Sequence, residues 1–521
     1  MTVPLATSML LGAATAFCGT QLLLRHNVRR LLLERPADCH HTHRVPVPRL
    51  GGLALVISFV VVEGFTALFC PSQPTQSPER NVVFWASLAM FALGFCDDLR
   101  PLEAKRKLFF QTMIASATCF FGIKIQWFTI PGGGTIHLGL WGPALTVFWL
   151  VGLTNLINFI DGLDGLAGGT CLMLMGLTLL ISHHTGTFGF LTAGMVGALA
   201  AFLWFNWPPA RIYMGDGGAY FLGFQIGAFA VVNSQNGAAP PYFIAALLLL
   251  APFILDMALT ILRRSLRGLP VFRPDKKHLH HRLLAMGATP RKALISMYAL
   301  TLPFLLMGLL VVWSRGKLAP IFAVIAVLTL LIYAWFLPFS RRWFAVKSVL
   351  GNSLGMRPQT QYTQSLGQWF ELEGGRHETL ESLWDDFVFV VRRLGFCFVK
   401  VRLSDSERIW DRKVERRCPL SARLEVQRGR FGILEFEVPG CPNHNGQELA
   451  CEDNKSCAWH SKGCPSDPRV FETVSELLAE SWTKAIARWS RRRLGPLSFN
   501  VSNEQTASRK NGFVSKEHLP T

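Results

Sequence analysis

The sequence has little charge for its length. Only 17% of its 521 residues are Asp, Glu, Lys or Arg, whereas 50% are hydrophobic, and the mean hydropathy is +0.30. A wholly soluble protein rarely combines this length with so few charged residues and so high a mean hydropathy. Acidic residues are fewer than basic ones, 34 against 52. The net charge is +18. We interpret the excess of basic residues as serving contacts with anionic lipid and phosphate substrates, and we expect no nucleic-acid partner.

The first two thirds of the chain consist of repeated apolar runs. A helix needs about 20 apolar residues to cross the roughly 30 Å hydrocarbon core of a bilayer. Runs of about this length occur at 3–24, 51–70, 81–97, 107–128, 138–158, 165–183, 187–206, 215–233, 241–262, 293–313 and 318–338. The sequence therefore predicts an all-α polytopic membrane protein, with about 11 transmembrane helices in residues 1–340.

Positive charge is nearly absent from the even-numbered connections between these runs. They hold 4 Lys and Arg residues, whereas the odd-numbered connections hold 20. The positive-inside rule places the odd connections in the cytoplasm. An odd number of spans then puts the N-terminus outside and the C-terminal tail inside. No basic segment precedes the first run, which predicts an uncleaved first helix rather than a signal peptide.

The tail is a different kind of polypeptide. Residues 396–402 and 431–438 alternate apolar and polar side chains, as half-buried strands do, and residues 471–489 carry an apolar helical stripe. We expect a small cytoplasmic α+β domain at 345–497, whose element order resembles a GAF-like sensor domain. The polar segment 498–521 is expected to be disordered.

An insert in the tail, residues 418–464, is rich in Cys and His. Stable disulfides are disfavoured in a cytoplasmic domain. The spacing allows two interpretations, a structural Zn²⁺ site or free thiols in a loop. The candidate zinc ligands are Cys441, His444, Cys451, Cys457, His460 and Cys464.

Five short polar motifs lie at the ends of the apolar runs. Each falls in an odd-numbered connection, so all five should converge on the cytoplasmic face, as an active site requires. They are RVPVPRLGG (44–52), DDL (97–99), NLINFIDGLDG (155–165), MGDGG (214–218) and HLHHRL (278–283).

The DDL motif places Asp97 and Asp98 side by side at a membrane boundary, before four basic residues between 100 and 107. Adjacent carboxylates repel one another and are costly to desolvate. A shared proton or a hard cation such as Mg²⁺, bound together with substrate phosphates, would stabilise the pair. The alternative is a solvated helix end.

The NLINFIDGLDG motif repeats polar residues every three positions. Asn155, Asn158 and Asp161 therefore share one helical face, and Asp164 follows where Gly162 weakens the helix. Amides can bind a nucleobase, a sugar hydroxyl or a phosphate, and carboxylates can bind metal or accept a proton. The alternative is hydrogen bonding between spans.

The MGDGG motif combines glycines with one carboxylate. Its amides, at a helix N-terminus, suit an oxyanion or phosphate. Because bare phosphate would repel Asp216, the motif suggests a bridging cation, whereas a plain turn is the alternative.

The HLHHRL motif brings three imidazoles into a basic loop. The spacing of His278, His280 and His281 is poor for a closed tetrahedral metal site. A pyrophosphate clamp fits better, and Arg44 and Arg49 would add donors to it.

Asp256 is a carboxylate inside the ninth predicted span. An ionisable group at that depth is a functional candidate by default. A buried ion pair with Arg263 or Arg264 is the alternative.

The order and spacing of the motifs resemble the polyprenyl-phosphate N-acetylhexosamine-1-phosphate transferase superfamily, glycosyltransferase family 4. The resemblance covers residues 1–340, and NLINFIDGLDGLAGG is its most specific piece. It implies an enzyme of the inner (plasma) membrane with a cytoplasmic active site. Such enzymes use Mg²⁺, with Mn²⁺ as an alternative, to transfer a sugar 1-phosphate from a UDP-sugar to polyprenyl phosphate, releasing UMP. Dimers are common among them, so a homodimer is an open possibility.

The HLHHRL motif also indicates the branch. Enzymes that use UDP-MurNAc-pentapeptide usually have consecutive His residues followed by Glu, whereas here Leu279 interrupts the run and Arg282 follows. This pattern is similar to the undecaprenyl-phosphate GlcNAc-1-phosphate transferase branch, which initiates O-antigen, teichoic acid or related glycans. The pentapeptide branch stays an alternative, as does a multi-span transporter, although a transporter should place its polar residues near mid-membrane.

The resemblance implies a role for each motif. Asp216 would be the leading Mg²⁺ ligand, and Asp97 and Asp98 would bind metal-bridged substrates or deprotonate the lipid phosphate. The implied catalytic residues are Asp97, Asp98, Asp161 and Asp164, and the implied substrate-binding residues are Arg49, Asn155, Asn158, His278, His280, His281 and Arg282.

Overall fold

The computed structural model describes residues 2–25, 47–69, 78–129, 134–185, 188–233, 239–269, 278–314, 316–336, 346–403, 407–412, 417–429, 432–439 and 468–494. The chain divides into two compact units, Met1–Leu354 and Gly355–Thr521. Each unit has its own apolar core.

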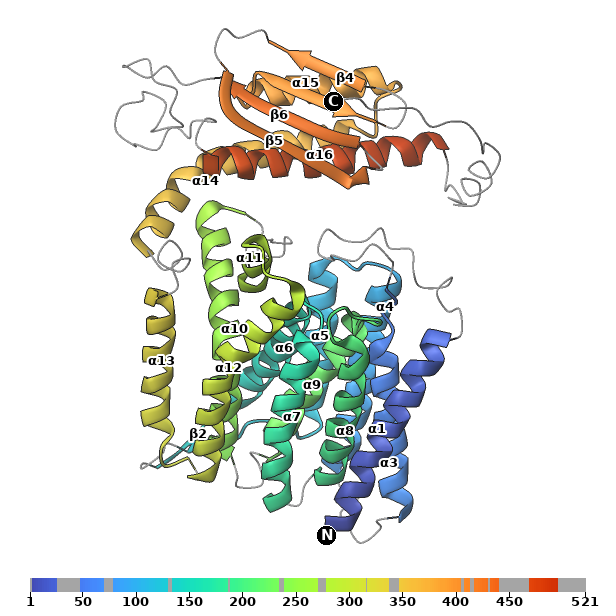
Figure 1. Ribbon diagram of the computed structural model, residues 1–521, viewed down its shortest axis with the longest axis vertical. Coiled ribbons are helices and arrows are strands. Elements are labelled where there is room, and N and C mark those ends of the chain that lie inside the picture. Colours follow the sequence, from blue (N-terminus) through green and yellow to red (C-terminus); the bar gives the residue numbers. More distant parts are fainter. Residues whose placement is uncertain are drawn as a thin grey trace, which may run out of the picture. The chain divides into compact units, whose positions relative to one another are not determined.

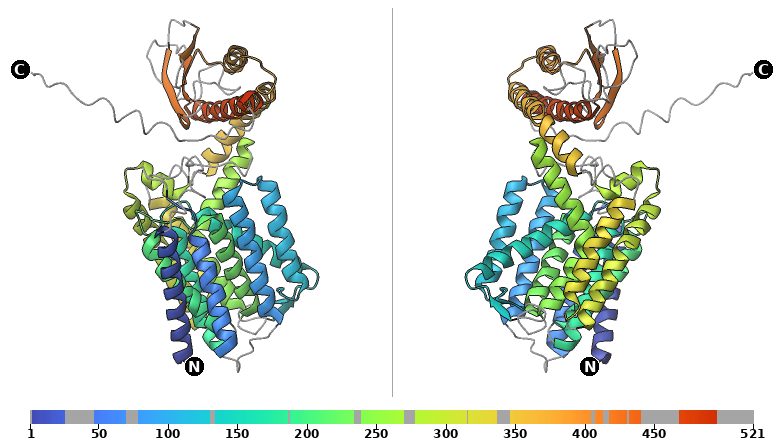
Figure 2. Two further views of the ribbon diagram at one scale, coloured as in Figure 1. Left: turned by 90° about the vertical axis from the view of Figure 1, so that its right-hand side faces the viewer. Right: turned by 90° about the vertical axis from the view of Figure 1, so that its left-hand side faces the viewer.

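The first unit is a bundle of helices that run side by side (Figures 1 and 2). A helix lies on each of the eleven apolar ranges predicted from the sequence, and a hairpin of two short strands and a short helix α11 lie between them. The elements are α1 (Thr2–Arg25), α3 (Gly51–Phe69), α4 (Pro78–Leu99), α5 (Ala104–Phe120), β1 (Trp127–Thr129), β2 (Thr135–His137), α6 (Trp141–Ile160), α7 (Leu166–Thr185), α8 (Gly189–Asn206), α9 (Gly215–Asn233), α10 (Ala239–Arg267), α11 (Leu279–Ala285), α12 (Pro290–Trp313) and α13 (Ala319–Phe336).

Seven of the helices in the described residues are long and apolar enough to cross a membrane: α1, α3, α4, α6, α8, α10 and α12. Shorter apolar stretches lie in α7 and α13. A polytopic membrane protein is thus confirmed, whereas the total of 11 spans stays a prediction. The N-terminus lies at one end of the bundle and α11 at the other (Figure 1).

Helix α9 is the centre of the bundle. Every residue of α9 except Asp216 is buried, and α4 and α6 pack on it most extensively. Glycines permit this close approach. A Cβ atom on Gly94 of α4 would lie 2.4 Å from the carbonyl oxygen of Asp216, and one on Gly52 of α3 would lie 2.4 Å from the backbone nitrogen of Gly218. The start of α9 is therefore fixed between two neighbouring helices.

An ion pair joins α3 and α4 away from the polar motifs. Arg80 donates from Nε to Glu63 Oε1 at 2.7 Å and from Nη2 to Glu63 Oε2 at 2.8 Å, and it also contacts Thr66. The Arg80 side chain is 9% exposed and that of Glu63 is 16% exposed. The two-pronged geometry satisfies both charges, which makes their burial tolerable.

The second unit is α+β, as the sequence predicts. Its antiparallel sheet has the strand order β4–β3–β6–β5, and Val399, Val401, Leu434 and Phe436 alternate inward to a core that includes Trp482. The predicted strands and helix at 396–402, 431–438 and 471–489 correspond to β3, β6 and α16. The bounds are α14 (Val346–Glu373), α15 (Leu380–Arg393), β3 (Phe398–Arg402), β4 (Glu407–Asp411), β5 (Arg417–Gly429), β6 (Gly432–Pro439) and α16 (Pro468–Leu494).

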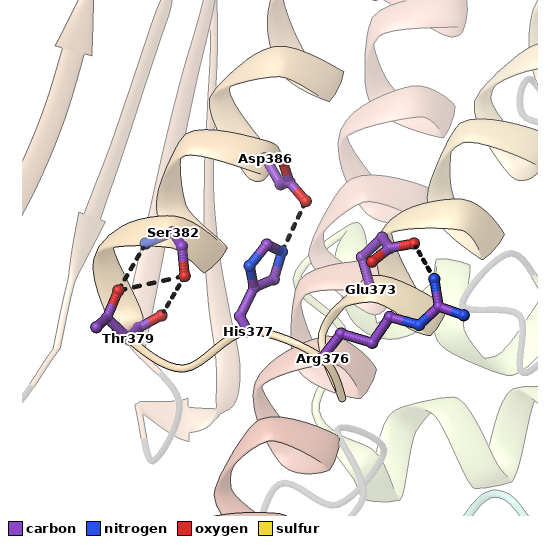
Figure 3. Close-up of polar contacts among 6 residues, drawn as sticks. All are labelled: Glu373, Arg376, His377, Thr379, Ser382 and Asp386. Carbon is purple, nitrogen blue, oxygen red and sulfur yellow. Dashed lines mark hydrogen bonds and ion pairs between the residues drawn. The ribbon is translucent and has the colours of Figure 1, made fainter.

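Side-chain contacts fix the turn between α14 and α15 (Figure 3). His377 Nε2 lies 2.7 Å from Asp386 Oδ2. Thr379 caps α15 by accepting a hydrogen bond from the Ser382 amide at 3.2 Å. The cap satisfies one of the amides that a helix start leaves without an intrahelical partner.

Some sequence predictions fall outside the described residues. They include Arg44, all six candidate zinc ligands (Cys441, His444, Cys451, Cys457, His460 and Cys464) and the polar segment 498–521. The zinc site, the GAF-like assignment and the disorder therefore stay predictions.

The contact between α4 and α9 leads to a first prediction. Gly94→Ala should lower the thermal unfolding midpoint in detergent micelles, because overpacking against backbone costs about 1–3 kcal/mol. Gly64→Ala is the matched control, since a Cβ there meets nothing within 4 Å and α3 should gain about 0.5–1 kcal/mol from the better helix former. Equal midpoints for the two variants would contradict the close approach of α4 and α9.

The ion pair leads to a second prediction. Glu63→Gln leaves the Arg80 charge without its carboxylate, which costs up to about 3–5 kcal/mol in a buried pair. We expect a lower thermal midpoint by differential scanning fluorimetry in micelles. A midpoint equal to that of the wild type would show that solvent already compensates Arg80.

Candidate active site

Four of the five polar motifs contribute directly to one cavity of about 1060 Å³ in the first unit. The cavity lies among α5, α6, α9, α10 and α11. Lys107, which lines it, contacts Asp97 of the DDL motif. Its polar lining includes Arg49, Lys107, Asn155, Asn158, Asp161, Asp164, Asn206, Asp216, Arg264, His278, His280 and His281. The motifs thus come together as their shared side of the membrane predicts.

A lysine that the sequence analysis did not select lies between two of the carboxylates. Lys107, in the first turn of α5, contacts Asp97 Oδ2, and its Nζ lies 3.9 Å from Asp216 Oδ2. Asp97 is fully buried and also accepts hydrogen bonds from the Leu102 amide at 2.8 Å and the Tyr220 hydroxyl at 3.4 Å. The ammonium group therefore offsets the charge that Asp97 and Asp216 concentrate here.

Asp98 fixes the start of α9. Its Oδ2 accepts a hydrogen bond from the Gly217 amide at 2.9 Å. Gly215 has a φ of 78°, and a Cβ atom there would lie 2.7 Å from Asp98 Oδ2. Glycine is needed both for the left-handed backbone and for the close carboxylate. The MGDGG and DDL motifs thus contact each other at the start of α9.

The RVPVPRLGG motif runs alongside the MGDGG motif. Tyr213 donates from its amide to Pro48 O at 2.8 Å, while the Gly51 and Gly52 amides donate to Tyr213 O and Met214 O, both at 2.9 Å. These backbone bonds fix the segment that leads to Asp216. The described end of the motif therefore supports the carboxylate site as well as supplying Arg49 to the cavity lining.

The first asparagine of NLINFIDGLDG has neighbours in the protein. Asn155 donates from Nδ2 to Gln111 Oε1 at 2.7 Å and to Val151 O at 2.8 Å. The alternative of hydrogen bonding between spans therefore applies to Asn155, which joins α6 to α5 and also lines the cavity. Asn158 lies one turn nearer the end of α6 and lines the same cavity.

Asp161 follows the last residue of α6 and lines the cavity. Desolvation raises the pKa of its carboxyl well above the ordinary value, and the negative charges of Asp216 and Asp98 act in the same direction, whereas Arg49 opposes them. This carboxyl therefore favours a proton or a nearby cation more than an isolated carboxylate would.

Asp164 and Asn206 connect two loops. Asp164 Oδ2 accepts a hydrogen bond from the Ala210 amide at 3.0 Å, and Asn206 Oδ1 accepts one from the Gly165 amide at 3.0 Å. Asn206 also donates from Nδ2 to Ile212 O at 2.8 Å. The sequence analysis missed Asn206, whose only signal is its place at the end of an apolar run.

The three histidines of HLHHRL cluster at the start of α11. The His280 and His281 rings lie 4.3 Å apart, and His280 is so close to Gly162 that a Cβ on that glycine would lie 2.7 Å from Nε2. The His motif thus meets NLINFIDGLDG directly. Arg282 lies in α11 and is not among the residues that line the cavity.

One side of the cavity is apolar. Leu108 of α5, Val147, Phe148 and Val151 of α6 and Ile261 of α10 line it. Phe148 is 75% exposed and Leu108 is 39% exposed, so this side reaches the outer surface of the bundle. A ligand with a charged head and a hydrocarbon chain fits a cavity with this division.

The carboxylates fit a hard divalent cation. Asp97 and Asp216 are in direct contact with each other and share Lys107. Mg²⁺ is usually held by one or two carboxylates, with water and substrate phosphates completing its octahedron. No group of three His, Cys, Asp or Glu side chains among the described residues could hold a metal ion by itself. A cation held by these carboxylates would therefore need further oxygen ligands from water or substrate.

Comparison with known proteins agrees with the motifs. The sequence profile described as "Glycosyl transferase family 4" matches residues 81–234, which include three of the five motifs. A "Probable undecaprenyl-phosphate N-acetylglucosaminyl 1-phosphate transferase" from Bacillus subtilis is 28% identical over 299 residues, which are 57% of this chain and 82% of that relative.

Two further relatives extend the comparison. A "Decaprenyl-phosphate N-acetylglucosaminephosphotransferase" from Mycobacterium tuberculosis is 30% identical over 336 residues, covering 57% of this chain and 80% of the relative. A "Phospho-N-acetylmuramoyl-pentapeptide-transferase" from a Geobacillus strain is 28% identical over 291 residues, covering 52% and 86%. The chain belongs to glycosyl transferase family 4 and is a membrane transferase.

Proposed function

We propose that this protein transfers N-acetylglucosamine 1-phosphate from UDP-GlcNAc to undecaprenyl phosphate, in a Mg²⁺-dependent reaction that releases UMP. The observation that carries the proposal is the cavity itself, in which carboxylates, amides and imidazoles from four motifs face an apolar side. Phosphoryl transfer between two anions needs neutralised charge and aligned atoms, and this lining supplies groups for both. The relatives named for GlcNAc 1-phosphate transfer support the choice of sugar.

In the proposed reaction an oxygen of the lipid phosphate forms a bond to the sugar-bearing phosphorus. The bond from that phosphorus to the bridging oxygen breaks, and UMP leaves with that oxygen. Asp216 and Asp97 would hold Mg²⁺, with Mn²⁺ as a substitute, and the ion would neutralise the diphosphate. Lys107, which contacts both carboxylates, would keep their charge compensated while the substrates bind and leave.

The remaining motif residues would position the two substrates. Asn158, Asp161 and Asp164 would hold the nucleotide sugar, and His280 and His281 would donate hydrogen bonds to the diphosphate. Asn155 would act through α5, because it bonds to Gln111. The lipid chain would lie along the apolar side at Phe148 and Ile261.

The proposal also covers the location and assembly of the protein. The cavity would open to the cytoplasm at the inner membrane, with the N-terminus outside, so that a cytoplasmic UDP-sugar meets a membrane lipid at the first step of a cell-envelope glycan. We also propose a homodimer, and a cytoplasmic accessory domain at 345–497 whose insert at 418–464 binds Zn²⁺.

The function leads to a direct assay. Purified protein with Mg²⁺, undecaprenyl phosphate and UDP-GlcNAc should release UMP, and EDTA should abolish the release until Mg²⁺ is restored. A panel of UDP-sugars, including UDP-MurNAc-pentapeptide, measures the choice of sugar by comparing kcat/KM. Faster turnover of the pentapeptide would favour that branch, and folded protein that releases no UMP from any of them would refute the transferase.

The metal site leads to a mutational test. Asp216→Asn should lower kcat by at least about 10²–10³-fold, because the amide cannot neutralise a cation and the transition-state charge loses that partner. Expression and the elution volume on size exclusion should stay near those of the wild type. Glu63→Gln is the control, since it removes a carboxylate from the same unit away from the cavity. Wild-type turnover by Asp216→Asn would remove this residue from the metal site.

A further inference from the structure

Asp256 is a buried carboxylate to which the proposed chemistry assigns no role. It lies inside the apolar helix α10, and the residue is only 8% exposed. Its Oδ2 lies 3.4 Å from His278 Nδ1 and 3.4 Å from the Leu279 amide nitrogen. These two contacts join α10 to the first residues of the HLHHRL motif.

The His278 ring is held from two helices. Thr260, one turn after Asp256 in α10, has its Oγ1 3.4 Å from Nδ1 of the same ring. The ring of Phe159 in α6 meets the imidazole nearly at a right angle, with centroids 4.3 Å apart. Residues of α10 thus face one nitrogen, and His278 itself lines the cavity.

We propose that Asp256 is a positioning residue that sets the orientation of His278 and the start of α11. The inference rests on the proposed function, in which His280 and His281 of this motif donate hydrogen bonds to the diphosphate. A carboxylate beside Nδ1 accepts a hydrogen bond from that nitrogen and fixes the plane of the ring, so that Nε2 is the nitrogen left to face a ligand. The contact with the Leu279 amide sets the first turn of α11, which carries His280 and His281.

A purely structural carboxylate would behave differently. If Asp256 only stabilised α10, its loss would lower the amount of folded enzyme and leave the turnover of the folded fraction intact. If it positions His278 and the start of α11, its loss also lowers the turnover of the folded fraction. Both parts of this distinction can be measured in full-length protein in micelles.

The test uses Asp256→Asn, Asp256→Glu, His278→Gln and the double variant Asp256→Asn/His278→Gln. We expect Asp256→Asn to lower kcat by about 10- to 100-fold, the usual effect of removing a group that orients a ligand-binding His. The KM for UDP-GlcNAc should change by less than about threefold, since the missing interaction would belong to the transition state. Asp256→Glu, which keeps a carboxylate, should recover most of the loss.

The double variant separates the two roles. It should be no slower than the slower single variant, because groups that act as a unit are not additive. Losses that multiply, or an Asp256→Asn enzyme with the wild-type kcat, would overturn the proposal. Glu63→Gln controls for stability alone, with a lower thermal midpoint and unchanged kcat.

A second readout does not depend on catalysis. Amide hydrogen exchange of the peptide covering residues 278–285 should be faster in Asp256→Asn than in the wild type and in Glu63→Gln. Unchanged exchange would overturn the contact with α11. If the wild type released no UMP while this peptide still exchanged faster in Asp256→Asn, the proposed function would fail and the positioning of α11 would stand.

Discussion

The cavity end of the first unit depends on holding like charges together at a membrane boundary. Two unit charges about 4 Å apart interact by about 4 kcal/mol at an effective dielectric of about 20. A typical hydrogen bond contributes only about 1 kcal/mol net, so amides alone cannot hold Asp97 against Asp216. Lys107 contacts both carboxylates, and its ammonium group supplies the larger compensation.

Backbone packing sets the distances among those charges. Gly94 and Gly52 bring α4 and α3 against the first turn of α9, and Gly215 gives Asp98 access to the Gly217 amide. Because α9 is buried along its length, these contacts are enclosed by other helices. Rigid neighbours hold the carboxylates in a fixed arrangement, which reduces the reorganisation needed when a cation or a phosphate binds.

The sequence predicted the polar groups of the cavity better than the residues that hold them in place. The shared parity of the connections was sufficient to predict that Asp161, Asp216 and His280 lie on one side, and the cavity brings them together. The orientation inferred from charge stays a prediction. Hydrophobic periodicity was sufficient for the helices, for β3 and β6 and for α16. The accessory unit's other strands, β4 and β5, are more polar, so their pairing depends on the sheet and not on local pattern.

Residues that act across helices could not be predicted in the same way. Lys107 resembles any basic residue beside a membrane, and Asn206 any helix end, until the fold places them against Asp97 and Gly165. Gln111 offered one signal, a polar side chain within an apolar run, and it is the partner of Asn155. The RVPVPRLGG motif was assigned only arginine donors, whereas its glycine amides bond to the strand-like segment before Asp216.

The burial of α9 has a consequence for biosynthesis. The helices that pack on it most extensively, α4, α6, α3 and α7, all precede it in the chain. During synthesis these neighbours are therefore available before α9 is made. The nascent protein then holds Asp97, Asp98, Asp161 and Asp164 before it holds Asp216. Entry of α9 between the earlier helices brings the MGDGG motif to the DDL motif, and the HLHHRL motif joins the cavity when α10 and α11 follow. The contact between the DDL and MGDGG motifs therefore depends on the insertion of a single glycine-rich segment.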